Sequence, residues 1–128
     1  MKLFTKTQMV KLLKNGSPEQ RGKDHAPVVK LFTPDAQCTW LLTDIDPENH
    51  DIAFGLCDLG LGFPELAYVS LSELSAIRGG LGLPIERDRH FEAEHPMSVY
   101  ANAARAAQRI VTNDIKLLAQ IASARKEE

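Results

Sequence analysis

Apolar residues follow a helical spacing near both ends of the chain. Near the start, Thr5 and Gln8 form the pattern of a capping box and Asn15-Gly16 supplies a stop, so we predict a helix between them. Its apolar stripe consists of Met9, Val10, Leu12 and Leu13. From Ser98 onward, an alanine-rich stretch with apolar residues three, four or seven positions apart predicts the longest helix. Residues 112–114 either interrupt this helix or restart it.

Four short runs rich in β-branched, aromatic and leucine residues predict strands. They are residues 28–32, 38–43, 52–57 and 66–69. Pro34 and Asp35 lie between the first two runs at positions typical of a turn, which predicts a β-hairpin. Between the second and third runs, residues 44–51 form an acidic turn. The third run presents Ala53, Gly55 and Cys57 on one face, and these small residues indicate that a helix packs closely there.

A short helix is predicted after the fourth strand. Ser70 and Glu73 form a second capping-box pattern, and Leu71, Leu74 and Ile77 are spaced to face a core. Residues 84–91 alternate charges, as an edge strand does. Because the strands are joined by links of hairpin length, we expect an α+β fold with a small, mostly antiparallel sheet of four to five strands. An N-terminal helix, a short middle helix and a long C-terminal helix pack it. Residues 1–112 are expected to form one domain, and residues 113–128 a C-terminal helical extension.

The composition is that of a globular protein. With 44% hydrophobic and 25% charged residues, the 128-residue chain suits one domain. No apolar run approaches the roughly 20 residues of a membrane span. The N-terminus lacks the uninterrupted apolar core of a secretory signal, so we expect a cytoplasmic protein without membrane contact. Cys38 and Cys57 lie in predicted strands, and we expect free, buried thiols.

Acidic residues gather in the middle of the sequence, although the net charge is only −2. Between Lys30 and Arg78 there are eight acids and no Lys or Arg. Such a distribution either is neutralised within the fold or remains as a charged surface. We predict a docking surface that combines acids of this stretch with two apolar residues of a glycine-rich loop. Its members are Asp44, Asp46, Glu48, Asp51, Asp58, Leu61, Phe63 and Glu65.

No catalytic, metal or cofactor signature is complete. A calcium-binding loop starting at Asp44 fails, because Asn49 and Gly55 stand where glycine and glutamate are required. A dinucleotide fingerprint starting at residue 60 fails because Glu65 replaces its third glycine. Cys57 lies in no recognisable catalytic signature. We therefore predict no catalytic residue, no metal ion and no cofactor.

Two other surfaces could meet partners. The C-terminal extension carries an apolar face that suits a partner helix or a symmetric dimer, and packing on the same domain is an equal alternative. This face consists of Ile115, Leu117, Leu118 and Ile121. The N-terminal helix carries lysines that could contact phosphates, but no aromatic residues interleave them, so nucleic-acid binding ranks last among our alternatives.

Three segments resemble a known family. WLLTDIDP, DIAFGLCDLGLGFPELAYVSLSEL and PIERD are similar to the signature of a bacterial family of small proteins of unknown function, over about residues 2–111. Ala67 stands where the family usually has glycine before Tyr68. The resemblance implies a gene carried on plasmids and integrative elements, beside conjugation or anti-restriction genes, and it transfers no catalytic residue.

The leading hypothesis is a non-enzymatic accessory protein of a mobile genetic element, which binds an unknown protein partner through its acidic surface in an anti-defence role. The first alternative is a metal-assisted hydrolase that uses residues 44–51. The second alternative is nucleic-acid binding through the basic N-terminal helix.

Overall fold

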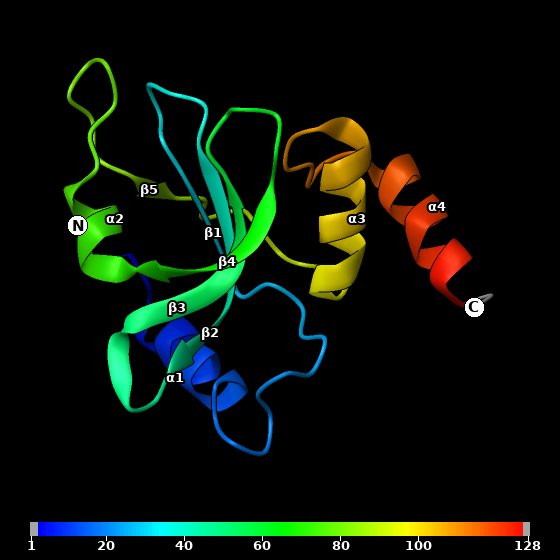
Figure 1. The fold of residues 1–128 in the computed structure, drawn as a ribbon, viewed down its shortest axis with the longest axis horizontal. Helices are drawn as coiled ribbons and strands as arrows, with labels where there is room; N and C mark the ends of the chain where they lie inside the picture. Colours follow the sequence, from blue (N-terminus) through cyan, green and yellow to red (C-terminus); the bar gives the residue numbers. More distant parts are fainter. Residues whose placement is uncertain (1–2, 127–128) are drawn as a thin grey trace.

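The chain folds around a five-stranded antiparallel sheet with helices against both faces (Figure 1). The structure is a computed structural model and describes residues 3–126. The strand order is β4-β3-β2-β1-β5, so β4 and β5 are the edges. The elements are α1 (Lys6–Asn15), β1 (Val29–Phe32), β2 (Thr39–Asp46), β3 (Asn49–Asp58), β4 (Glu65–Ser70), α2 (Leu71–Ala76), β5 (Glu86–Arg87), α3 (Met97–Ala107) and α4 (Ile115–Lys126). The predicted α+β class is confirmed, although the strand predicted at residues 84–91 shrinks to the two residues of β5.

The first helix begins and ends where its sequence signals lie. The Thr5 hydroxyl accepts a hydrogen bond from the backbone N–H of Gln8 at 3.1 Å, and the Gln8 side chain accepts one from the N–H of Thr5 at 2.9 Å. The predicted capping box is therefore confirmed. At the other end, Gly16 has an ordinary right-handed conformation. A Cβ on Gly16 would lie 2.0 Å from the carbonyl oxygen of Ile45, so glycine is needed because α1 ends directly against β2.

Neighbouring residues of β2 contribute to two separate cores, because strand side chains alternate between the faces of a sheet. Trp40 and Leu42 are buried on the face covered by α1 and α2. Leu41 is buried on the opposite face, which packs against α3 and α4. The next strand, β3, divides in the same way, with Ala53 on the α1 side and Leu56 on the α3 side. The sheet is thus the middle layer of a three-layer domain.

The small residues on one face of β3 have two different causes. Ala53 packs into the core beneath α1, as the sequence pattern indicated. Gly55 is required by the neighbouring strand β2 instead, since a Cβ on Gly55 would lie 2.0 Å from the carbonyl oxygen of Leu41. The pairing of β2 with β3 shifts register between Leu42 and Asp44, and such a bulge bends the strand that carries it. The expectation of a helix against Gly55 is therefore corrected.

The segment 44–51 is not the long acidic turn that we expected. β2 continues through Asp46 and β3 begins at Asn49, which leaves only Pro47 and Glu48 in the turn. The turn is tightened by Asp46, whose carboxylate accepts a hydrogen bond from the N–H of Glu48 at 2.9 Å. Because Pro47 occupies the turn itself, it does not end β2 early. Asp44 and Asp51 consequently stand on strands.

The long C-terminal stretch consists of two helices. α3 ends at Ala107, and Gln108 follows in the left-handed conformation with φ 61°. α4 starts after Asp114, whose carboxylate accepts a hydrogen bond from the N–H of Leu117 at 3.1 Å. Of the two alternatives for residues 112–114, the restart is the one observed: the first helix already ends at Ala107, and the second begins at Ile115. Within residues 3–126 no helix is both long and apolar enough to cross a bilayer.

Candidate functional site

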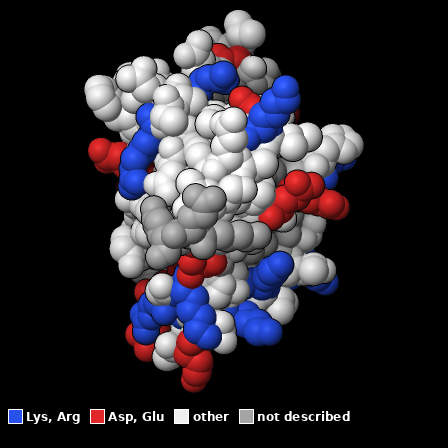
Figure 2. All heavy atoms as spheres, turned by 90° about the vertical axis from the view of Figure 1, so that its right-hand side faces the viewer, with Lys and Arg blue, Asp and Glu red and all other residues white. Residues whose placement is uncertain are grey.

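The acidic residues of the middle segment do not form one surface. Asp51 and Asp58 lie toward opposite ends of β3, seven residues apart, which is roughly 23 Å along a strand. On the face that carries α4, basic and acidic side chains are interspersed (Figure 2). Several of the carboxylates instead accept hydrogen bonds from backbone N–H groups of their own fold.

Asp58 is a structural residue in the interior. Only 4% of it is exposed, and its carboxylate accepts hydrogen bonds from the N–H of Gly60 at 2.8 Å and of Ile110 at 2.9 Å. These bonds fasten the glycine-rich loop after β3 to the segment between α3 and α4. Asp58 is therefore not available to a partner, in contrast to its predicted role.

Asp51 connects β3 to the start of α2. Its carboxylate accepts hydrogen bonds from the Ser70 hydroxyl at 2.6 Å and from the backbone N–H of Ser72 at 2.8 Å. These bonds stabilise the charged form and lower the pKa of Asp51. Ser70 also accepts a hydrogen bond from the N–H of Glu73 at 3.3 Å, so Ser70 caps α2 as predicted, although the Glu73 side chain does not complete the predicted capping box.

Asp44 and Asp46 offer no metal site. Burial raises the pKa of Asp44, and the hydrogen bond from Thr43 at 2.9 Å offsets only part of that rise. Asp46 is used in the turn, while Glu48 is exposed. Among residues 3–126 no three His, Cys, Asp or Glu side chains gather closely enough to hold a metal ion. The geometry therefore gives no support to a hydrolase centred on residues 44–51.

Cys57 is poorly suited to act as a nucleophile. Burial, with a smaller contribution from the charge of Glu65, raises the pKa of the Cys57 thiol to about 11. A thiol of that pKa carries little of the reactive thiolate at neutral pH. Cys57 and Cys38 are both free and partly buried, and they pack against the core beneath α1.

The glycine-rich loop between β3 and β4 exposes two large apolar side chains. Gly60 and Gly62 have φ of 80° and 87°, values that a residue with a Cβ rarely adopts. These turns leave Leu61 72% exposed and Phe63 78% exposed. The loop therefore exposes Leu61 and Phe63 just before the chain enters β4. The predicted docking surface requires both side chains to be exposed.

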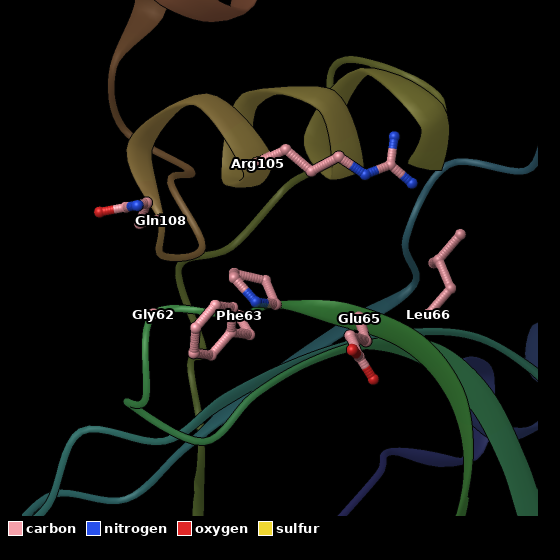
Figure 3. A pocket seen from close by; sticks show the side chains of 7 residues that line it. Gly62, Phe63, Glu65, Leu66, Arg105 and Gln108 are labelled. Atoms are coloured by element: carbon pink, nitrogen blue, oxygen red, sulfur yellow. The ribbon is translucent and has the colours of Figure 1, made fainter.

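A cavity of about 570 Å³ lies between this loop, the start of β4 and the end of α3. It is lined by Gly62, Phe63, Pro64, Glu65, Leu66, Arg105 and Gln108. The Arg105 side chain extends from α3 toward Leu66, whereas the Glu65 carboxylate points away from it (Figure 3). Arg105 donates a hydrogen bond to the side-chain oxygen of Asn102 at 3.0 Å. Among the described residues, no carboxylate lies within ion-pair distance of Arg105.

Further along β4, the face of the sheet that elsewhere packs against α3 is not covered by any helix of the described residues. Leu66 and Tyr68 share the face that packs against α3, but they remain 42% and 71% exposed. The Tyr68 ring lies against Phe54 of β3, with 5.0 Å between ring centroids. A second hollow of about 370 Å³ continues along this face and shares Leu66 with the first. We use the name β4 edge for Phe63, Leu66 and Tyr68 together with Arg105.

The apolar face predicted on the C-terminal extension is mostly covered by the protein itself. Leu118 is buried, and Leu117 and Ile121 pack against the core on the α3 side. Ile115 is the exception and is 75% exposed. Of the two alternatives, packing on the same domain therefore accounts for three of the four residues.

Sequence reasoning identified Leu61, Phe63 and Glu65 but missed Leu66, Tyr68, Arg105 and Gln108. In the sequence, Leu66 and Tyr68 alternate like any half-buried strand, and nothing marks their face as uncovered. Arg105 looked like a solvated position on an alanine-rich helix. No local sequence pattern marks Arg105 as lying beside the glycine-rich loop.

The fold and this edge define a small α+β domain with an exposed apolar site. Residues 3–111 match the family described as Protein of unknown function (DUF2958), and the chain belongs to that family. The match ends before α4. No curated protein and no solved structure matches the chain.

Proposed function

We propose that this protein is a non-enzymatic binding module whose contact surface for a protein partner is the β4 edge. The observation that carries the proposal is the exposure of Leu66 and Tyr68 on one face of an edge strand, together with the exposure of Phe63 in the loop that leads into it. Clustered apolar side chains of this kind mark interaction sites, whereas isolated exposed ones need no explanation. Aromatic residues and arginine are also the side chains most enriched where protein interfaces gain their affinity.

The proposed surface is apolar with one cation, and it replaces most of the acidic surface expected from sequence. Asp51 and Asp58 are engaged in hydrogen bonds that hold the fold. Leu61, Phe63 and Glu65 remain at the end of the proposed site. The wider setting, an accessory or anti-defence protein of a mobile genetic element, is part of the proposal and is supported by the family resemblance alone.

Site-specific photo-crosslinking tests the proposal. A photoreactive phenylalanine analogue replaces Phe63 or Tyr68 in one pair of variants, and Val10 or Leu81 in a matched control pair. Val10 and Leu81 are also exposed apolar residues, at 66% and 82%, but they lie away from the β4 edge. In host cells we expect covalent adducts with the same second protein from positions 63 and 68, and none from 10 and 81. Equal labelling at all four positions, or none at 63 and 68, would contradict the proposal.

A further inference from the structure

We infer that the β4 edge binds an extended segment of its partner as a sixth strand of the sheet, and that a carboxylate of that segment pairs with Arg105. This inference rests on the proposed function and specifies the chemistry of the partner. For such binding, the outer side of β4 must be open to pairing. The side chains beside β4 must also favour an acidic strand over a second copy of this chain.

The outer side of β4 is open. β4 pairs with β3 on its inner side, and within residues 3–126 no strand pairs with its outer side. An edge strand presents a row of backbone N–H and C=O groups that another extended chain can satisfy. The six residues of β4 span roughly 20 Å, enough to pair with a peptide of similar length.

The two edges of this sheet differ in a way that supports the inference. Natural proteins protect edge strands by keeping them short or by adding charges and proline. β5 is two residues long and is followed by Asp88 and Arg89. β4 has the sequence ELAYVS, which contains no Lys, Arg or Pro and has its only charge at Glu65. One edge is therefore protected, whereas the other is left fit for pairing.

The side chains beside β4 determine which strand would fit. Leu66 and Tyr68 lie on the α3 face, so alternate side chains of an added strand would meet them on that face. Arg105 reaches over the same face toward Leu66 (Figure 3). Glu65 lines the same cavity but forms no ion pair with Arg105, because Glu65 pairs with Cys57 across the sheet and its carboxylate points away from the guanidinium (Figure 3). The site therefore suits apolar side chains accompanied by a carboxylate, which arginine binds with favourable geometry.

A second copy of the chain fits this site less well. In an antiparallel β4–β4 pair, side chains would keep their faces, so Leu66 and Tyr68 of the two copies could meet. The pair would also bring two Arg105 side chains to one face and supply no carboxylate from β4, because the Glu65 carboxylate points away from the guanidinium (Figure 3). Like charges brought together without a counterion oppose association. Charge complementarity thus favours a different, acidic chain.

Selection from a library of linear peptides tests the inference on the full-length protein. Random peptides of about ten residues are long enough to cover β4. We expect the selected peptides to alternate apolar residues and to carry Asp or Glu. Arg105→Glu should weaken their binding about tenfold or more, and Arg109→Glu should leave it unchanged. Arg109 is the matched control because it is exposed on the same segment but does not line the cavity.

Hydrogen exchange supplies the test of strand pairing. On addition of a selected peptide, backbone amides within residues 65–70 should exchange more slowly, because a sixth strand would accept their hydrogen bonds. Peptides without an acid preference, equal binding by the Arg105→Glu variant, or unchanged exchange in β4 would each overturn the inference. Protection of these amides without peptide, together with a dimer in light scattering, would assign the edge to a second copy instead. If crosslinking at Phe63 still identifies a partner, failure of the peptide test refutes only this inference and not the proposed function.

Discussion

The carboxylate of Asp58 accepts a hydrogen bond from the backbone N–H of Ile110 at 2.9 Å, which ties the end of β3 to the segment that follows α3. A second bond, from Gly60, fixes the start of the glycine-rich loop. The cavity beside β4 lies between these two fastened segments. Asp58 thus helps to shape the candidate site although it cannot reach a partner.

Replacing Asp58 by alanine should destabilise the protein strongly. Two backbone N–H groups would lose their acceptor in a region with little access to water, at a cost of about 2–4 kcal/mol in the free energy of unfolding. Asp46→Ala is the matched control, since Asp46 accepts one bond in an outer turn and its loss should cost about 1 kcal/mol. Urea unfolding measures both variants. Equal losses would show that the Asp58 bonds contribute no more than a surface turn.

Gly16→Ala should be more damaging than its ordinary backbone conformation suggests. The added Cβ would lie 2.0 Å from the carbonyl oxygen of Ile45, so α1 must move away from β2, with an expected cost of about 3 kcal/mol. Gly22→Ala provides the contrast, because Gly22 has φ 88° with no neighbour near its missing Cβ and should cost about 1 kcal/mol. Thermal unfolding of both variants gives the comparison. A milder effect at residue 16 would mean that α1 is not held against β2.

Gln108→Gly should stabilise the protein. Gln108 ends α3 in the left-handed conformation, where glycine avoids a steric cost of about 1 kcal/mol. Gln108→Ala is the matched control, because alanine loses the same side chain but keeps the Cβ, and its stability should be close to that of glutamine. A rise in unfolding temperature for the glycine variant alone is expected. A rise for both variants would place the cause in the side chain and not in the backbone.

The acid dependence of stability should respond in opposite directions to Asp51 and Asp44. The folded-state pKa of Asp51 is lowered from 3.8, so the unfolded chain binds more protons and stability falls as the pH decreases below about 3.8. The folded-state pKa of Asp44 is raised from 3.8, so Asp44 makes stability fall as the pH increases above that value.

Asparagine variants isolate these two contributions. The free energy of unfolding should be measured with urea between about pH 3 and pH 6. For Asp51→Asn, it should fall less steeply than in the wild type as the pH decreases. For Asp44→Asn, it should fall less than in the wild type as the pH increases. The two variants control for one another, since each removes one carboxylate. A change of the same sign in both would contradict the hydrogen-bond explanation for Asp51.

Cys57 should alkylate slowly in the folded protein. With a pKa of about 11 instead of the ordinary 9.0, its thiolate fraction at neutral pH is about 100-fold lower. Iodoacetamide labelling of a Cys38→Ser variant, followed by mass spectrometry, isolates Cys57. The same protein in urea is the control and should react at the rate of an ordinary thiol. Equal rates in both states would refute the effect of burial.

The sequence predicted well what depends on near neighbours in the chain. Thr5 and Gln8 identified the start of α1, since both halves of a capping box lie within four residues. The four main strands were located by their composition. Whether a given carboxylate is exposed or is hydrogen-bonded within the fold was not predictable in this way. Asp58 is buried because the N–H of Ile110, 52 positions away, needs an acceptor, and no local pattern reveals such a need.

The candidate site shows the same limit. Phe63 could be found because Gly60, Gly62 and Pro64 predicted a turn that exposes it. Arg105 could not, because its significance comes from the absence of a nearby carboxylate in three dimensions. A count of charges along the chain even suggested the opposite sign for the binding surface. The position of Gly16 was right but its reason was different, since contact with Ile45, and not a left-handed turn, requires the glycine.

The strand order has a consequence for how the chain acquires its structure. Each of β1, β2 and β3 pairs with the strand that follows it in sequence, so three of the four pairings in the sheet are between sequence neighbours. Pairings of this kind close small loops and therefore form quickly. Only β5 must return across the chain to reach β1. We expect the meander from β1 to β4 to form early during refolding, with its outermost strand unpaired on one side from the first moment.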